Sequence, residues 1–112
     1  LHFWATWCPP CREELSGLLA LGDELRRSGR AELVAVTVDT DWEAVRTFFG
    51  GDPPAAIYKD VSGRAAGAYD VATLPDTFLL SADGAPILRF AGARDWRSDA
   101  AREVLEQHLV RR

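Results

Sequence analysis

The chain has 112 residues, of which 47% are hydrophobic and 10% aromatic, and its formal net charge is −4. This length and composition are typical of one globular domain with a buried core, so we expect a single domain over residues 1–112. The acidic balance argues against nucleic acid as a partner, because phosphate binding requires a concentrated positive surface. The sequence contains no run of 18 apolar residues that could span a membrane.

The first elements are a strand and a helix. A short apolar run over residues 1–5 predicts a buried strand. Pro9 and Pro10 then open a helix, since proline is favoured in a first helical turn, and leucines at helical spacing continue it until Ser28 and Gly29. Because the sequence does not begin with Met and its first residues already read as a strand, we expect one or more native strands to precede it.

The middle of the chain continues the alternation of strand and helix. Residues 32–38 are rich in β-branched side chains and predict a second buried strand. Asp39 and Asp41 follow as candidate N-caps for an amphipathic helix over 44–49. A brief strand is expected at 55–58.

The remaining elements complete an α/β pattern. A short helix is expected over 64–69, and two apolar runs at 77–80 and 87–90 flank an Asp-Gly turn, which is a strong hairpin signal. Apolar residues over 101–109 fall on one face and predict a last amphipathic helix. The order β-α-β-α-(β)-α-β-β-α indicates a sheet with a hairpin at its edge, flanked by helices.

The chemistry of the chain is concentrated in the sequence Cys-Pro-Pro-Cys. A strand delivers Cys8 to the start of a helix, where unpaired N–H groups and the helix dipole stabilise a thiolate. Cys11 lies one turn further along and can resolve a mixed disulfide. We therefore expect Cys8 to be the nucleophile, Pro9 and Pro10 to shape its turn, and Trp7 to cover one side of its sulfur.

Two other classes of function remain as alternatives. Zinc usually takes four ligands, and the sequence offers only His2 and His108 beside the cysteine pair, so we expect no metal site. A non-enzymatic metal-binding module, which would use the cysteines as ligands, is nevertheless one alternative. A thiol peroxidase is the other, although no segment with the required Thr and Arg around a peroxide-reactive cysteine is visible.

Three segments carry a resemblance to a known family. Residues 3–11 (FWATWCPPC) resemble the active-site signature of the TlpA/ResA-type thioredoxin-like proteins, and residues 61–71 and 74–84 resemble the segments that follow it. The resemblance implies a thioredoxin fold, a central mixed β-sheet flanked by helices. It also implies a central insertion, here roughly residues 40–58. No cofactor is implied other than the redox-active cysteine pair.

The same resemblance implies a function outside the cytoplasm. Members of this family are extracytoplasmic thiol–disulfide oxidoreductases, often disulfide reductases that serve cytochrome c maturation or periplasmic disulfide reduction. The implied partners are protein disulfides and an electron donor of membrane or thioredoxin type. We expect a monomer and leave open a membrane anchor outside this sequence. The direction of electron flow also stays open, because the reduction potential decides it.

The resemblance also assigns further residues to the site. Pro75 corresponds to a cis-proline that faces the cysteine pair, and the backbone of Leu74 would pair with substrate main chain. His2 stands where relatives carry a buried acid or Asn, so it is either a proton relay for Cys11 or a hydrogen-bonded core histidine. Glu14 is interpreted first as support for the helix. Some reductases of this family carry a glutamate near the active site where this chain has Thr40, so either Asp39 or Asp41 could substitute for it, although N-capping is the expected role. The aromatic side chains Trp42 and Trp96 are expected to be partly exposed.

Overall fold

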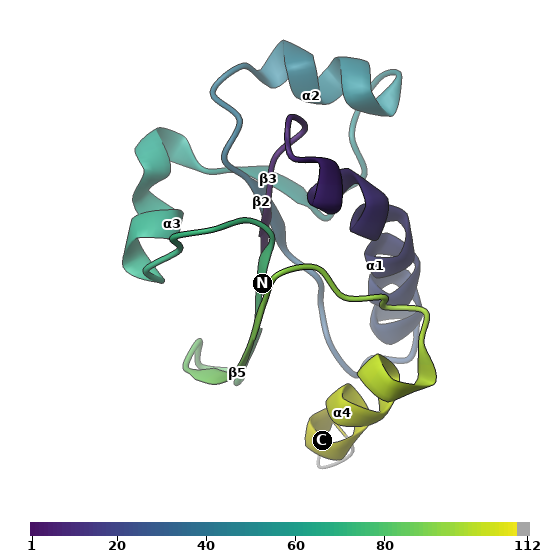
Figure 1. The fold of residues 1–112 in the computed structure, drawn as a ribbon. Coiled ribbons are helices and arrows are strands. Elements are labelled where there is room, and N and C mark those ends of the chain that lie inside the picture. Colours follow the sequence, from purple (N-terminus) through teal and green to yellow (C-terminus); the bar gives the residue numbers. More distant parts are fainter. Residues whose placement is uncertain (110–112) are drawn as a thin grey trace.

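A five-stranded mixed sheet forms the centre of the molecule, seen nearly edge-on in Figure 1. The computed structural model describes residues 1–109, so residues 110–112 of the predicted domain lie outside the described part. The strand order is β3-β2-β1-β4-β5, with β1, β2 and β3 parallel and β4 antiparallel to both of its neighbours. The strands are β1 (His2–Trp4), β2 (Ala35–Thr37), β3 (Ile57–Lys59), β4 (Asp76–Leu80) and β5 (Pro86–Ala91).

Helices cover both faces of the sheet and its upper end. Helices α1 (Pro9–Arg27) and α4 (Asp99–Leu109) lie on one face, and α3 (Arg64–Ala68) lies on the other after a short 3-10 turn, η1 (Val61–Gly63). Helix α2 (Trp42–Phe49) crosses the end near the start of α1 (Figure 1). This arrangement confirms the predicted α/β architecture.

Helix α1 begins and ends where the sequence predicts. Proline occupies its first two positions, where a missing N–H loses no intrahelical bond, and Ser28 is the C-cap. The helix is continuous through Ser16, the position at which thioredoxins carry a kinking proline. Gly22 lets α1 pack closely against Leu33, since a Cβ at position 22 would lie 2.7 Å from the Leu33 side chain.

The core divides between the two faces because successive residues of β1 point in opposite directions. Phe3 packs with Phe78 and Tyr69 on the α3 face. Trp4 packs on the other face with Phe48 and Phe49 of α2, in a cluster that also contains both cysteines. A third cluster, between α1, α4 and the hairpin, is built from Leu18, Leu21, Trp96, Leu105 and Leu109.

Two strands are shorter or shifted relative to the prediction. The second strand spans Ala35–Thr37 rather than 32–38, and the third spans Ile57–Lys59 rather than 55–58. The reason is pairing: β1 supplies only three residues before the chain turns toward Cys8, so β2 finds a parallel partner only over that length. β-propensity alone does not reveal where the neighbouring strand ends.

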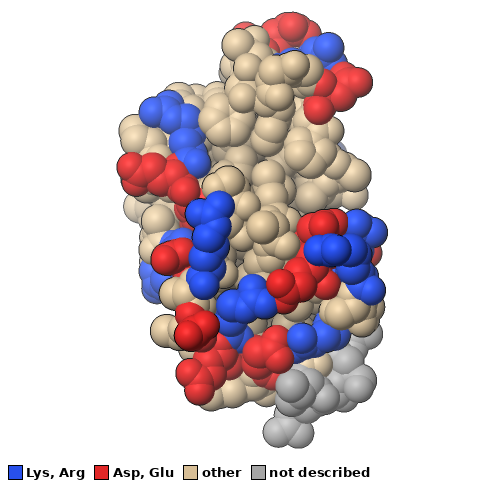
Figure 2. Space-filling view, turned by 90° about the vertical axis from the view of Figure 1, so that its right-hand side faces the viewer, with Lys and Arg blue, Asp and Glu red and all other residues tan. Residues whose placement is uncertain are grey.

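Charged side chains are distributed unevenly over one face of the molecule. Figure 2 shows them over the lower half of one face, together with a small group at the top, separated by a largely uncharged region. Ion pairs join α1 and the residues after its end to α4: Arg102 pairs with Glu24, and Arg30 pairs with Glu106. Trp7, next to Cys8 in sequence, is 63% exposed and adds apolar surface at the predicted active site.

Candidate active site

Cys8 and Cys11 form a disulfide at the N-terminus of α1, with their Cα atoms 5.2 Å apart. Cys8 is the N-cap, and its sulfur accepts a hydrogen bond from the Cys11 N–H at 3.4 Å. Because Pro9 and Pro10 have no N–H, this amide is the first one that the helix can offer to the sulfur. Both cysteines are buried, but Cys8 keeps 6% exposure whereas Cys11 has none. Access therefore favours Cys8 as the attacking sulfur.

The turn before Cys8 is held by Asp39, which sequence analysis offered as an N-cap. Its carboxylate accepts hydrogen bonds from the N–H and hydroxyl of Thr6, at 2.9 and 2.7 Å, and another from the Thr37 hydroxyl. Helix α2 is instead capped by Asp41, which accepts a bond from the Glu43 N–H at 3.0 Å. The N-cap interpretation is thus confirmed for Asp41 and wrong for Asp39, because the carboxylate faces the active-site turn from the end of β2.

The Leu74–Pro75 peptide is cis, as the resemblance implies. Pro75 is buried, and its carbonyl accepts a hydrogen bond from the Gly92 N–H at 2.9 Å. Leu74 packs against the core cluster that contains Cys8 and Cys11. The structure therefore brings the segment before β4 to the disulfide, across more than sixty residues of sequence.

A groove of about 540 Å³ opens beside Cys8. One side is formed by Trp7, Cys8 and Pro9, and the other by residues 71–74, with Val38 and Ala66 completing the lining. None of these lining residues is charged. The groove thus presents an uncharged surface beside Cys8.

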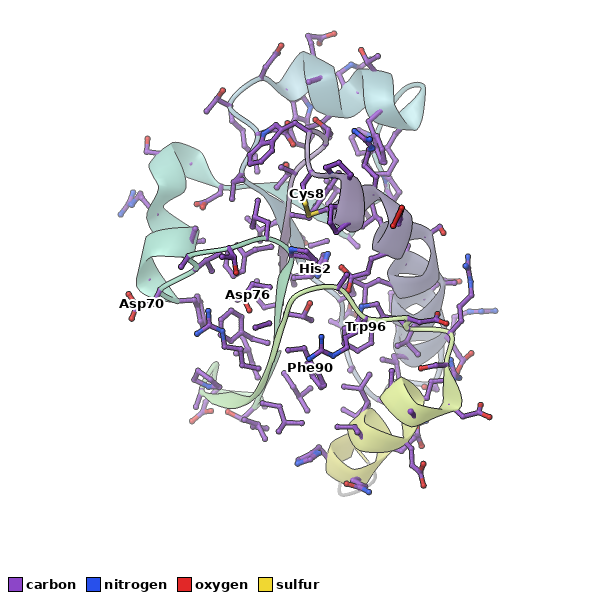
Figure 3. All side chains as sticks on the ribbon, viewed as in Figure 1. His2, Cys8, Asp70, Asp76, Phe90 and Trp96 are labelled. Atoms are coloured by element: carbon purple, nitrogen blue, oxygen red, sulfur yellow. A yellow bond between two sulfur atoms is a disulfide. The ribbon has the colours of Figure 1, made fainter. Side chains whose placement is uncertain are left out.

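His2 lies fully buried below the disulfide (Figure 3) and is anchored on one ring nitrogen only. Its Nδ1 is 2.8 Å from the Thr77 hydroxyl, whereas Nε2 has no hydrogen-bond partner in the described structure and lies 3.6 Å from Glu14 Oε1. Burial is the main cause that lowers the pKa of His2, to about 3. The ring is therefore neutral near pH 7.

Glu14, which sequence analysis interpreted first as support for the helix, is a buried member of the site. Its side chain is 1% exposed, and its Oε2 accepts hydrogen bonds from the Trp96 indole at 2.6 Å and the Arg94 N–H at 2.9 Å. Burial raises the pKa of Glu14, against the opposing effect of these two donors. The available signal was spacing: a residue three positions after Cys11 shares its helix face, which is the buried one.

Trp96 corrects a second expectation. It is 2% exposed rather than partly exposed, because its indole N–H reaches Glu14 and its ring packs edge-on against Phe90 at 5.2 Å. Trp42 is half-buried, as expected. The segment between β5 and α4 thereby closes over the face of α1 that carries Glu14 (Figure 3).

Residues 1–109 offer neither a metal-ligand cluster nor a helix suited to span a membrane. No group of three or more His, Cys, Asp or Glu side chains in that range could hold a metal ion. Among the helices of the same range, none is both long and apolar enough to cross a membrane.

Comparison with solved structures shows the fold. An exposed lipoprotein thioredoxin, Etrx1 of Streptococcus pneumoniae, superposes with a TM-score of 0.78 over 95% of this chain and 81% of that chain, at 18% identity. A thiol–disulfide oxidoreductase from Bacteroides fragilis superposes with a TM-score of 0.74 over 96% of this chain and 78% of that chain, at 28% identity. The chain thus has the thioredoxin fold.

Comparison of sequences places the chain in a family. The thiol–disulfide oxidoreductase ResA of Bacillus thuringiensis is 32% identical over 112 residues, covering 97% of this chain and 60% of that protein. The chain therefore spans about 60% of the length of this curated relative. The AhpC/TSA family matches residues 1–85, which include the cysteine pair and the cis-proline. The chain belongs to the AhpC/TSA family, and among that family's members it is similar to the ResA-type oxidoreductases.

Proposed function

We propose that this chain is a thiol–disulfide oxidoreductase that reduces disulfides in other proteins through Cys8 and Cys11. The observation that carries the proposal is the cysteine pair at the start of α1, with its more accessible sulfur opening onto an uncharged groove. Similarity to a protein named as a thiol–disulfide oxidoreductase supports the reaction class.

The reaction proceeds through a mixed disulfide. The Cys8 thiolate, stabilised by the helix N-terminus, attacks one sulfur of the substrate disulfide and releases the first substrate thiolate. Cys11 then loses its proton and attacks the Cys8 sulfur, which releases the second substrate thiolate. Two electrons pass to the substrate, and the protein ends as the Cys8–Cys11 disulfide.

The groove supplies the binding part of this proposal. An extended peptide lying in it would pass between Trp7 and Leu74, whose backbone immediately precedes the buried Pro75 and can pair with substrate main chain. Trp7 is exposed and offers apolar surface to the substrate. The position of these residues beside Cys8 supports the proposed roles.

The positions of His2 and Glu14 support a role as acceptors of the proton that Cys11 gives up. They share the interior below the helix face of Cys11, and each presents one unpaired polar atom to the other at 3.6 Å. A small side-chain movement would bring these atoms into hydrogen-bond range and let the pair hold one proton between them. The alternative, a core histidine held by Thr77, accounts for Nδ1 but not for the buried Nε2, which has no hydrogen-bond partner in the described structure.

Partners and location extend the proposal through family resemblance. Protein disulfides would be the substrates, in cytochrome c maturation or periplasmic disulfide reduction, and a membrane or thioredoxin-type donor would return electrons to the cysteines. The protein would act as a monomer outside the cytoplasm.

The test is reduction of a peptide disulfide by the reduced protein. Cys8→Ser should abolish turnover, whereas Cys11→Ser should trap a mixed disulfide with the substrate, detectable by mass. Full activity in Cys8→Ser would overturn the proposal. The reduction potential decides the direction: a value near about −120 mV, as in strong oxidants, would contradict the role as a reductase.

A further inference from the structure

One wall of the groove beside Cys8 is a short loop that makes few backbone hydrogen bonds to the rest of the described chain. Residues 71–74 line the groove, and within the described part of the chain no hydrogen bond joins residues 72–74 to other residues. The loop is fixed at its ends: the Val71 N–H bonds to the Ala66 carbonyl at 2.9 Å, and β4 pairs with β1 from Asp76 onward. Apart from the apolar packing of Leu74 against the core clusters, the position of this wall depends on what connects those two ends.

Arg89 of β5 makes that connection. Its Nε and Nη2 donate to the two carboxylate oxygens of Asp76 at 3.1 and 2.6 Å, a bidentate pair with a carboxylate that is 1% exposed. Nη2 also lies 3.5 Å from the Asp70 carbonyl, and the guanidinium stacks over the Phe78 ring at 5.1 Å. Figure 3 shows Asp70 and Asp76 on the α3 side of the sheet, at the two ends of the loop.

We propose that Arg89 is a positioning residue for substrate binding, which holds the groove wall in its binding shape before substrate arrives. A planar guanidinium suits this task because one side chain reaches a carboxylate with two donors and still offers one to a carbonyl. A wall that is already ordered spares the substrate the cost of ordering it. The inference rests on the proposed function, since it concerns the peptide that this function requires.

The prediction separates binding from chemistry. Arg89→Gln should raise the KM for a peptide disulfide by about tenfold, because the loop must be ordered at each binding event. The kcat should change by less than about twofold, and so should the rate with the small disulfide DTNB, which does not need the wall. Arg89→Lys should recover only part of the loss, since an ammonium cannot form the bidentate pair.

Two variants keep the test decisive. Arg89→Gln leaves the buried Asp76 without its partner, so Arg89→Gln combined with Asp76→Asn removes both charges and should fold while keeping the raised KM. Arg102→Gln is the control for loss of an arginine ion pair away from the groove, because it breaks an exposed pair with Glu24, between α4 and α1. This control should leave KM and kcat unchanged.

A measurement without substrate distinguishes this inference from the proposed function. Hydrogen exchange over residues 70–76 should become faster in Arg89→Gln and in the double variant, and stay unchanged in Arg102→Gln. Unchanged exchange in the Arg89 variants would overturn the inference, as would an equal fall in the peptide and DTNB rates. If the wild-type protein showed no thiol–disulfide exchange, the proposed function would be overturned instead. The hydrogen-exchange data would still decide whether Arg89 orders the loop.

Discussion

The buried histidine makes the stability of this protein depend on pH in a specific way. Folding holds the pKa of His2 at about 3, chiefly through burial, whereas the unfolded chain has the ordinary value of 6.5. Between pH 6.5 and 3 the unfolded state therefore binds a proton on His2 that the folded state does not bind, so the protein loses stability as pH falls through this range. At about pH 5 the loss from His2 amounts to roughly 2 kcal/mol relative to pH above 7.5.

The assay is urea unfolding of wild type and His2→Asn at both pH values. The free energy of unfolding of wild type relative to His2→Asn should fall by about 2 kcal/mol between about pH 7.5 and pH 5. The raised pKa of Glu14 acts in the opposite direction, since an acid with a raised pKa loses stability as pH rises, so only the difference between variants isolates His2. In a Glu14→Gln background the His2 difference should persist, because burial is its main cause. An equal difference at both pH values would refute the reasoning.

Two further predictions concern folding. Asp39→Ala should lower the free energy of unfolding by about 2–4 kcal/mol and slow disulfide exchange, because its carboxylate accepts three hydrogen bonds from the active-site turn and β2. Its control, Asp41→Ala, removes only an exposed N-cap and should cost about 1 kcal/mol. Gly22→Ala should destabilise by about 1–3 kcal/mol despite better helix propensity, because the new Cβ would lie 2.7 Å from Leu33. By contrast, a Cβ at Gly67 would meet nothing within 4 Å, so Gly67→Ala should stabilise the protein by about 0.5–1 kcal/mol. Urea unfolding measures the free energy of unfolding of all four variants. A stabilising Gly22→Ala or a neutral Asp39→Ala would contradict the packing described.

Much of the fold follows from patterns within a few residues of sequence. The two prolines after Cys8 fix the start of α1, and Ser28 and Gly29 fix its end. The Asp-Gly turn between two apolar runs fixes the hairpin of β4 and β5. These elements were predictable because turns, caps and helical periodicity depend on neighbours in the chain.

The local sequence by itself also placed the reactive pair, since a strand, two cysteines and two prolines in succession put Cys8 at a helix tip. It did not reveal what surrounds that tip. Glu14 is buried because Trp96 and the Arg94 amide, eighty or more residues away, cover it, and Asp39 faces Thr6 because β2 lies beside β1. Only tertiary structure decides such contacts, because burial and hydrogen bonding depend on which distant segments the folded sheet and helices bring together.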